Sequence, residues 1–265
     1  MDFRRQDYGK MKNSIIFLYF LFLSTSVLAQ TENLFKSFDN KIYNPKELGL
    51  NSLSVDAKVK GLTQTLKAIL IVPNISDVFF RITWDPKRQF NVKVIGLPPG
   101  FNEIKNSLEL TMVDKLRYFI PPKIINLVKD YSLSTKKLDS GIQYTLEDKT
   151  FLKGITKIDA FFDRDKNLSK MEFKGLNIWE MNTFKYEELS GTKKLVIKNF
   201  LVESGGPQVV YATSYSVDYT NAGKFFFPKT ISITAQVQTL PGEKGSKQTL
   251  AESKSEITFS NFQVK

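Results

Sequence analysis

The side chains that could do chemistry in this chain are carboxylates, serines and lysines, because the sequence contains no histidine and no cysteine. Without these two residue types, Ser-His-Asp and Cys-His triads cannot form, and neither can histidine-based zinc sites. Paired carboxylates could still serve a glycosidase or a lyase. No Asp or Glu, however, stands in an otherwise apolar strand pattern in a way that indicates a shifted pKa. We therefore predict that the protein is not an enzyme and has no catalytic residues.

One acidic stretch, Asp163–Asn167 (DRDKN), has the D-x-D-x-N opening of a calcium-binding loop. A full EF-hand loop requires glycine at its sixth position and a carboxylate at its twelfth, where this chain has Leu168 and Lys174. Two basic residues inside the stretch also repel a cation. We interpret the stretch as a solvated hairpin turn, and we predict no metal site and no cofactor.

Two S-x-x-K matches, Ser134–Lys137 and Ser190–Lys193, also carry groups that can react. Such a dyad works when the serine opens a helix and the lysine follows one turn later on the same side. Both matches stand in strand or turn sequence, and the companion S-D-N and K-T-G motifs are missing. We interpret both matches as chance.

The first 29 residues have the pattern of a secretory signal peptide. Two lysines precede the apolar run Ile15–Leu23, and the small residues Val27 and Ala29 then mark a cleavage site after Ala29. The run is too short to span a bilayer comfortably. We predict that residues 1–29 are removed, and that residues 30–265 form a single β-rich domain that is soluble in the periplasm or outside the cell.

The formal charge of the whole chain is +11. The first 29 residues contain four basic and two acidic residues, a net +2, so the remaining chain carries +9. This balance favours solubility and anionic partners, and it predicts transient contact with an anionic membrane surface. An exported chain is not expected to meet nucleic acid.

The stretch Phe101–Tyr131 interrupts a sequence that otherwise alternates mostly with period two after residue 50. Its apolar residues recur every three or four positions, which predicts one helix over Asn102–Ile120. The Pro121-Pro122 pair predicts where that helix ends, and a second short helix is expected over Ile124–Val128. We interpret this broken helical insert as a lid for a curved sheet.

The apolar side of the insert supplies the candidate ligand-binding lid, namely Leu108, Met112, Leu116, Phe119 and Ile120. Trp84 and Phe90 are the candidates for the sheet wall of the same site. If the insert is a mobile lid hinged at the prolines, Leu116→Asp should leave a folded protein with weaker lipid binding. If the insert is ordinary core, the same change should bury an unpaired carboxylate and destabilise the fold.

Most of the remaining chain predicts antiparallel strands, after a first helix over Thr31–Tyr43. The expected strands are Ser52–Lys60, Leu62–Val72, Asp77–Trp84, Gln89–Ile95, Leu133–Leu138, Ile142–Glu147, Thr156–Phe162, Leu168–Lys174, Lys193–Glu203, Gln208–Tyr219, Lys224–Thr239 and Thr249–Val264. Asn177–Glu187 fits either a strand or an exposed loop.

Aromatic residues are abundant, with 22 Phe, 10 Tyr and 2 Trp. Adjacent pairs such as Phe79/Phe80 and Phe161/Phe162 place an aromatic ring on both faces of one strand. Two interpretations are open: both sheet faces are fully covered by protein, or one face is only partly filled and leaves a ligand cavity.

The order of elements over residues 32–264 resembles that of the periplasmic lipoprotein-carrier (LolA/LolB-like) superfamily. The stretch Ile158–Phe173 (IDAFFDRDKNLSKMEF) is similar to the hairpin that follows the helices in those proteins, and Phe226–Ile233 (FFPKTISI) resembles their late strand. The resemblance implies an α+β fold, a single curved antiparallel half-barrel of about 11 strands with helices packed on the concave face. It also implies that the concave side binds acyl chains.

Two functions of different classes follow from these expectations. The first is a non-catalytic periplasmic carrier of lipid or lipoprotein acyl chains, with lipid or an acylated lipoprotein as its partner. The alternative is a structural or protein-interaction module of the envelope whose interior is filled, and whose positive charge and tyrosine series form the contact surface. That series is Tyr211, Tyr215 and Tyr219. The volume of the cavity between sheet and helices distinguishes the two.

Overall fold

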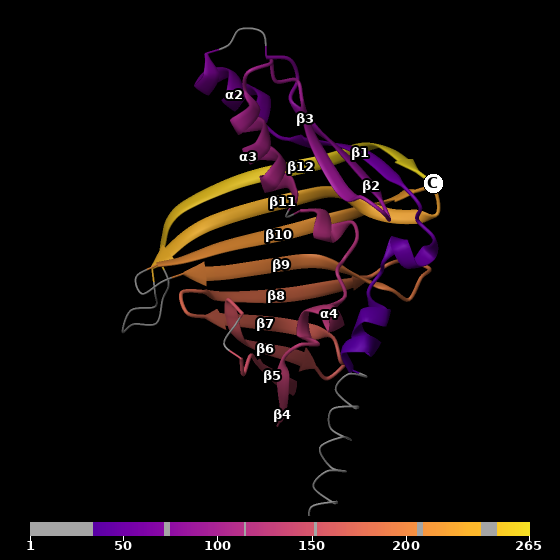
Figure 1. Ribbon diagram of the computed structural model, residues 1–265, viewed down its shortest axis with the longest axis vertical. Coiled ribbons are helices and arrows are strands. Elements are labelled where there is room, and N and C mark those ends of the chain that lie inside the picture. The colour runs from indigo at the N-terminus through magenta and orange to yellow at the C-terminus, as the bar shows by residue number, and fades with distance from the viewer. Residues whose placement is uncertain (1–33, 72–74, 114, 151–152, 206–208, 240–247) are drawn as a thin grey trace, which may run out of the picture.

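The computed structural model describes residues 34–71, 75–113, 115–150, 153–205, 209–239 and 248–265 (Figure 1). The predicted signal peptide lies outside these ranges. A helix over residues 34–41 precedes the 3-10 turn η1 (Pro45–Leu48), α2 (Leu62–Leu70), α3 (Asn102–Val113), the 3-10 turn η2 (Leu116–Tyr118) and α4 (Ile124–Val128). The strands are β1 (Leu53–Val59), β2 (Phe79–Asp85), β3 (Gln89–Ile95), β4 (Ser132–Leu138), β5 (Gly141–Glu147), β6 (Ile155–Asp163), β7 (Leu168–Gly175), β8 (Trp179–Glu188), β9 (Leu195–Gly205), β10 (Val209–Ala222), β11 (Phe225–Thr239) and β12 (Thr249–Val264).

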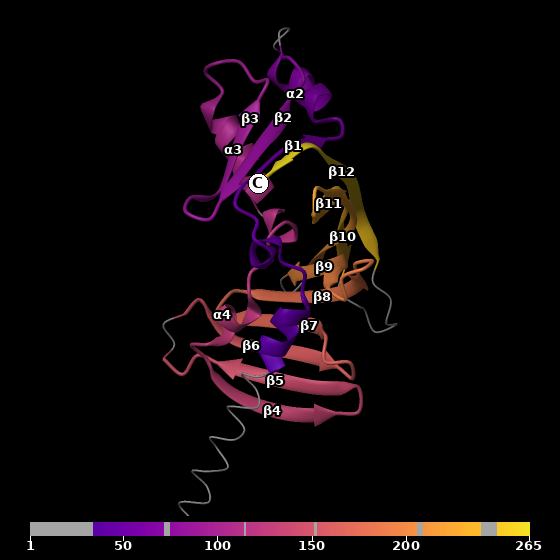
Figure 2. The same cartoon turned by 90° about the vertical axis from the view of Figure 1, so that its right-hand side faces the viewer.

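The described strands form one antiparallel sheet in the order β3-β2-β1-β12-β11-β10-β9-β8-β7-β6-β5-β4. The sheet is curved and does not close, so β3 and β4 are its two edges (Figures 1 and 2). The strand pattern and the resemblance together predicted one curved antiparallel sheet of about eleven strands, and this coarse architecture is confirmed with twelve described strands.

Most predicted hairpins are confirmed, because each of their turns has the residues that it needs. Leu138 pairs with Gly141 across a two-residue Asp139-Ser140 loop. The calcium-like stretch Asp163–Asn167 forms the turn between β6 and β7, as expected for a solvated hairpin. The Lys41 ammonium lies at this turn and donates to the backbone oxygen of Asp165 and to Asn167 Oδ1. The ambiguous stretch Asn177–Glu187 forms most of β8.

The expected strand over Leu62–Val72 is wrong, because Leu62–Leu70 is helix α2. Its apolar residues recur at the spacing of a helix face, and Leu66 is the buried one among them. Gly61 has a left-handed backbone at the start of the helix, a conformation that ends β1 without strain because glycine has no Cβ.

The predicted helix over Asn102–Ile120 is too long. Helix α3 ends at Val113, and the separate 3-10 turn η2 follows before the Pro121-Pro122 pair. The second predicted helix is confirmed as α4. The apolar spacing alone could not place the end of α3, because a 3-10 turn and an α-helix share a similar three-residue spacing.

The insert has to cross the whole sheet, because it connects two edge strands. β3 ends at Ile95 and β4 begins at Ser132, yet these strands lie at opposite edges. Twelve strands make eleven interstrand steps of about 4.8 Å, so the path along the sheet is roughly 50 Å. Residues 96–131 therefore run across one face of the sheet.

Contacts between rings mark this path. Phe119 packs on Phe227 of β11 and Phe259 of β12, with ring centroids 5.9 and 4.8 Å apart. Tyr118 packs on Phe200 of β9 at 6.4 Å. Farther along, α4 joins a second buried cluster with β5, β6 and the helix over residues 34–41. The insert thus contributes to both main clusters of the described core.

A buried carboxylate connects the first strands to the last one. Asp56 of β1 accepts two hydrogen bonds from the Arg81 guanidinium of β2, at 2.9 and 3.2 Å, and one from Asn261 Nδ2 of β12 at 3.0 Å. The β1–β12 register shifts at this point, and Asn261 adopts a left-handed backbone that asparagine tolerates well. The hydrogen bonds from Arg81 hold the pKa of Asp56 below its ordinary value.

We expect Asp56→Asn to lower the melting temperature by about 2–4 °C at neutral pH, because the amide accepts fewer of these hydrogen bonds. A lowered folded-state pKa means that the contribution is present above the ordinary Asp pKa and is lost as the pH falls through the lowered one. The wild-type advantage should therefore shrink below about pH 4 in melting curves recorded against pH. Asp218→Asn is the control, since that carboxylate is 64 % exposed in its ion pair with Lys198. Equal shifts in both variants would contradict the structural role of Asp56.

Candidate functional site

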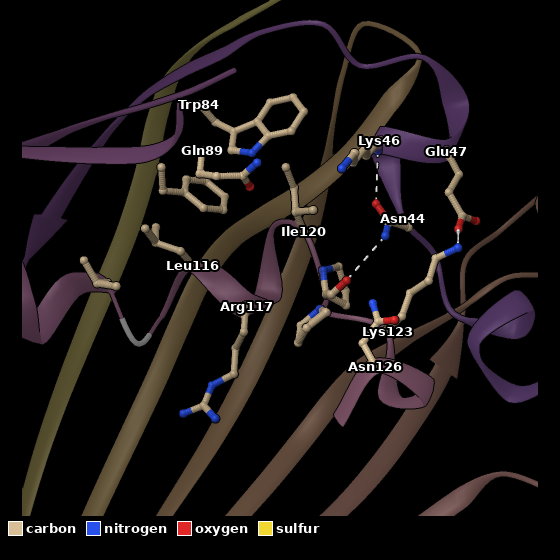
Figure 3. A pocket seen from close by; sticks show the side chains of 14 residues that line it. Asn44, Lys46, Glu47, Trp84, Gln89, Leu116, Arg117, Ile120, Lys123 and Asn126 are labelled. Atoms are coloured by element: carbon tan, nitrogen blue, oxygen red, sulfur yellow. Dashed lines mark hydrogen bonds and ion pairs between the residues drawn. The ribbon is translucent and has the colours of Figure 1, made fainter. Parts of the chain in front are cut away.

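A cavity of about 670 Å³ lies between the β2–β3 hairpin, η1 and the insert (Figure 3). We call it the hairpin cavity. Its lining residues are Asn44, Lys46, Glu47, Trp84, Gln89, Phe90, Val113, Leu116, Arg117, Ile120, Pro121, Pro122, Lys123 and Asn126. Three segments far apart in the sequence thus form one site, and the crossing of the sheet by the insert brings them together.

The wall of the hairpin cavity is aromatic and aliphatic. The rings of Trp84 and Phe90 lie 6.4 Å apart on the paired strands β2 and β3. Leu116 and Ile120 of the insert face them (Figure 3). Trp84 is only 2 % exposed, so the cavity reaches the buried interior of the protein. This wall can bind an apolar chain and offers no group for covalent chemistry.

The structure brings together four of the seven residues predicted from sequence, namely Trp84, Phe90, Leu116 and Ile120. The other three, Leu108, Met112 and Phe119, do not line this cavity. Met112 and Phe119 are buried in the main core, and Leu108 packs against the same cluster. Phe119 lies between Leu116 and Ile120 in the chain but packs on Phe227 and Phe259, and Leu108 and Met112 lie on α3.

Polar groups at one side of the hairpin cavity tether η1 to the insert. Lys123 Nζ lies 2.7 Å from Glu47 Oε1, and this contact raises the pKa of Lys123. Asn44 Oδ1 accepts from the Lys46 backbone N–H at 3.1 Å, and Asn44 Nδ2 donates to the Pro121 carbonyl oxygen at 3.3 Å. We call these groups the polar rim: Asn44, Lys46, Glu47 and Lys123 (Figure 3).

A second and smaller cavity, of about 180 Å³, lies between strands β7–β9, α4 and the helix over residues 34–41. We call it the inner cavity. Most of its lining is apolar, with Phe38, Ile42, Ile124, Leu127, Met171, Phe173, Phe184, Ile197 and Phe200 among the residues. It also contains Tyr118 and Asn182, two polar residues that the sequence analysis did not select.

The two cavities share part of their lining. Arg117, Pro121 and Pro122 contribute to both, so they lie between the hairpin cavity and the inner cavity. The Arg117 side chain extends away from Trp84 (Figure 3), and its guanidinium carbon lies 5.2 Å from the ring centre of Phe200. The predicted break at Pro121-Pro122 therefore lies between the hairpin cavity and the inner cavity.

The inner cavity is closed on one side by a capped helix. Asp39 accepts hydrogen bonds from the backbone N–H groups of Ile124 and Ile125 at 2.9 and 3.0 Å. Burial raises the pKa of Asp39, against the opposing effect of these two hydrogen bonds. The cap fixes the first turn of α4 to the helix over residues 34–41. The carboxylate is thus engaged and is not a candidate general base.

Within the described part of the chain, no group of three or more acidic side chains is arranged to hold a metal ion. No helix in that part is long and apolar enough to cross a membrane. No protein-family model, curated protein or solved structure matches the chain. The resemblance to lipoprotein carriers therefore rests on the sequence features alone.

One signal in the sequence could have identified Asn182. It shares the alternation phase of Phe184 and Tyr186, so it is a polar residue beside two aromatic residues on one strand face. No comparable signal marks Tyr118, because it does not fall on the helix face that the spacing of the insert predicted. Its position depends on η2, which the spacing did not reveal.

The sequence left two outcomes open for Leu116→Asp, a folded protein or a destabilised one, and the burial of Leu116 decides between them. Leu116 is 2 % exposed and belongs to the main core, whereas Ile120 is half-buried. We expect Leu116→Asp to lower the free energy of unfolding by roughly 3–5 kcal/mol, because its carboxylate has no partner in the core. Ile120→Asp should cost only about 1 kcal/mol.

Urea unfolding of the two variants, with the wild type alongside, measures this difference. Both variants replace a branched aliphatic residue of the same cavity wall with the same acid, so they differ chiefly in burial. If Leu116→Asp were as stable as Ile120→Asp, Leu116 would belong to a mobile lid and not to the core.

Proposed function

We propose that this protein is a non-catalytic carrier that binds the acyl chains of lipid or of a lipoprotein, and that it belongs with the LolA/LolB-like carriers. In this proposal the signal peptide directs export to the periplasm. The face crossed by the insert is the concave face of a half-barrel, and the insert covers it as a wall of the site. The observation that carries the proposal is the pair of adjoining, mostly apolar cavities on either side of Pro121 and Pro122.

The size and lining of the hairpin cavity support this proposal. Its volume of about 670 Å³ lies within the range of cavities that enclose small ligands, and its wall is aromatic and aliphatic. Burying about ten methylenes of an acyl chain contributes roughly 8 kcal/mol, which corresponds to a dissociation constant near 1 μM before the cost of opening. Such an affinity allows both binding and release, as a carrier requires.

The alternative function, an envelope interaction module, requires a filled interior. The two cavities count against it, and so does the tyrosine series that was to form its contact surface. Tyr211 is exposed, whereas Tyr215 is buried against Phe200 and Tyr118. A surface made of Tyr211, Tyr215 and Tyr219 is therefore not available as one exposed patch.

The two tryptophans of the chain give a direct test. Trp84 lines the hairpin cavity, whereas Trp179 lies on β8, donates to Glu172 Oε1 at 3.0 Å and lines neither cavity. A fatty acid with bromine in its chain quenches tryptophan emission only at short range. We expect it to quench the Trp179→Phe variant, which retains Trp84. The Trp84→Phe variant, which retains Trp179, should keep its emission.

The same titration with unbrominated fatty acid controls for changes in conformation. Absence of quenching in both variants would refute the carrier proposal for acyl chains of the length tested. Equal quenching of both would show that the fatty acid coats the surface without occupying the hairpin cavity. Native mass spectrometry of protein from an exporting host should show bound lipid as an independent measure.

A further inference from the structure

Two residues in the lining of the inner cavity each have one buried side-chain polar atom without a hydrogen-bond partner within the described part of the chain. These atoms are the Tyr118 hydroxyl oxygen and Asn182 Oδ1. Their residues are 3 % and 6 % exposed. A buried polar atom without a partner is unfavourable, and native proteins keep very few of them. Two in one apolar cavity therefore indicate a polar group that binds there.

The orientation of the Asn182 amide is set by its neighbour. Asn182 Nδ2 donates to Glu180 Oε1 at 2.8 Å. An ionised carboxylate only accepts, so the amide nitrogen has to face Glu180 and the amide oxygen has to be the free atom. Asn182 Oδ1 thus requires a donor. A carboxylate or an ether oxygen cannot supply one.

Tyr118 complements this acceptor. Burial raises the pKa of its phenol, so the hydroxyl stays protonated over the physiological range and can donate. Asp39, the remaining carboxylate of the inner cavity, is already engaged by the first turn of α4. Beside the Arg117 guanidinium and the engaged Asp39, the lining of the cavity therefore has one acceptor and one hydroxyl without a partner, among mostly apolar residues.

We propose that the inner cavity binds a neutral polar group of the ligand that both donates and accepts a hydrogen bond, namely a hydroxyl or an amide next to an acyl chain. Asn182 Oδ1 accepts from the N–H or O–H of this group, and the Tyr118 hydroxyl donates to its oxygen. This proposal rests on the proposed carrier function and specifies its ligand. It predicts preference for hydroxyl-bearing or amide-linked acyl chains over ethers of the same size.

Decanol and methyl nonyl ether test the preference, because they are isomers and only decanol has a donor. Displacement of a fluorescent fatty acid gives both affinities. We expect the wild-type protein to bind decanol about tenfold more tightly than methyl nonyl ether, because one hydrogen bond to a buried acceptor contributes about this factor. Asn182→Leu should bind both isomers equally. Tyr118→Phe should weaken both by a similar factor and keep the preference, because both isomers have an accepting oxygen.

Tyr211→Phe is the matched control for Tyr118→Phe, since Tyr211 is exposed and lines neither cavity. It should leave both affinities unchanged. The empty Tyr118→Phe protein should melt at the same or a higher temperature than the wild type, because it loses a buried hydroxyl that has no partner. A purely structural hydroxyl would instead make this variant melt lower.

Each remaining result has one meaning. Equal binding of the isomers by the wild type would overturn this inference and leave the carrier proposal intact, with water alone satisfying the two atoms. A preference that persists in Asn182→Leu would overturn the role of Asn182. Failure of the wild type to bind the fluorescent fatty acid, decanol and the ether alike would overturn both proposals. The comparison of isomers on the wild type does not depend on the folding of any variant.

Discussion

The connection between the two edge strands is the constraint on which the rest of this structure depends. β3 and β4 follow each other in the chain but lie at opposite edges of a 12-stranded sheet. Residues 96–131 therefore have to cross a face of the sheet over roughly 50 Å, which an uninterrupted helix of that many residues would also reach. A straight helix, however, cannot follow a curved sheet closely, because its axis bends only gently. The insert instead consists of α3, η2 and α4, which are short pieces with changes of direction between them.

The crossing also explains where the cavities lie. Phe119 fills the space over β11 and β12, and α4 fills the space over β5 and β6. Between these two fillings the chain passes through Pro121 and Pro122, whose rings cannot continue the hydrogen bonding of a helix. The hairpin cavity and the inner cavity adjoin this stretch, and both prolines line both cavities. A less regular segment packs the sheet less completely, so the cavities follow from the same break that the sequence shows.

The sequence predicted those parts of the fold that local patterns determine. The β4–β5 and β6–β7 hairpins follow from alternation and from turn residues, and they are confirmed. The pairing of β1 with β12 joins residues about 200 positions apart, and no local sequence pattern predicts it. The same holds for the cavity wall. Trp84 and Phe90 were recognisable as apolar strand residues, but the cavity that they share with Leu116 depends on the crossing, which only the strand order reveals.

For the proposed carrier, the free energies of the contacts favour one route by which a ligand reaches these cavities. Lifting the insert would expose Phe119, Leu116 and Met112, and each of these buried side chains contributes roughly 1.5–3 kcal/mol. Opening the polar rim would break one ion pair between half-exposed groups and one hydrogen bond of Asn44, which together contribute about 1–2 kcal/mol. The smaller cost favours access through the polar rim. The core of the insert then stays in place while the side chains of the polar rim move apart. In the proposed carrier the segment that crosses the sheet is therefore the fixed wall, and the polar rim beside it is the part that opens.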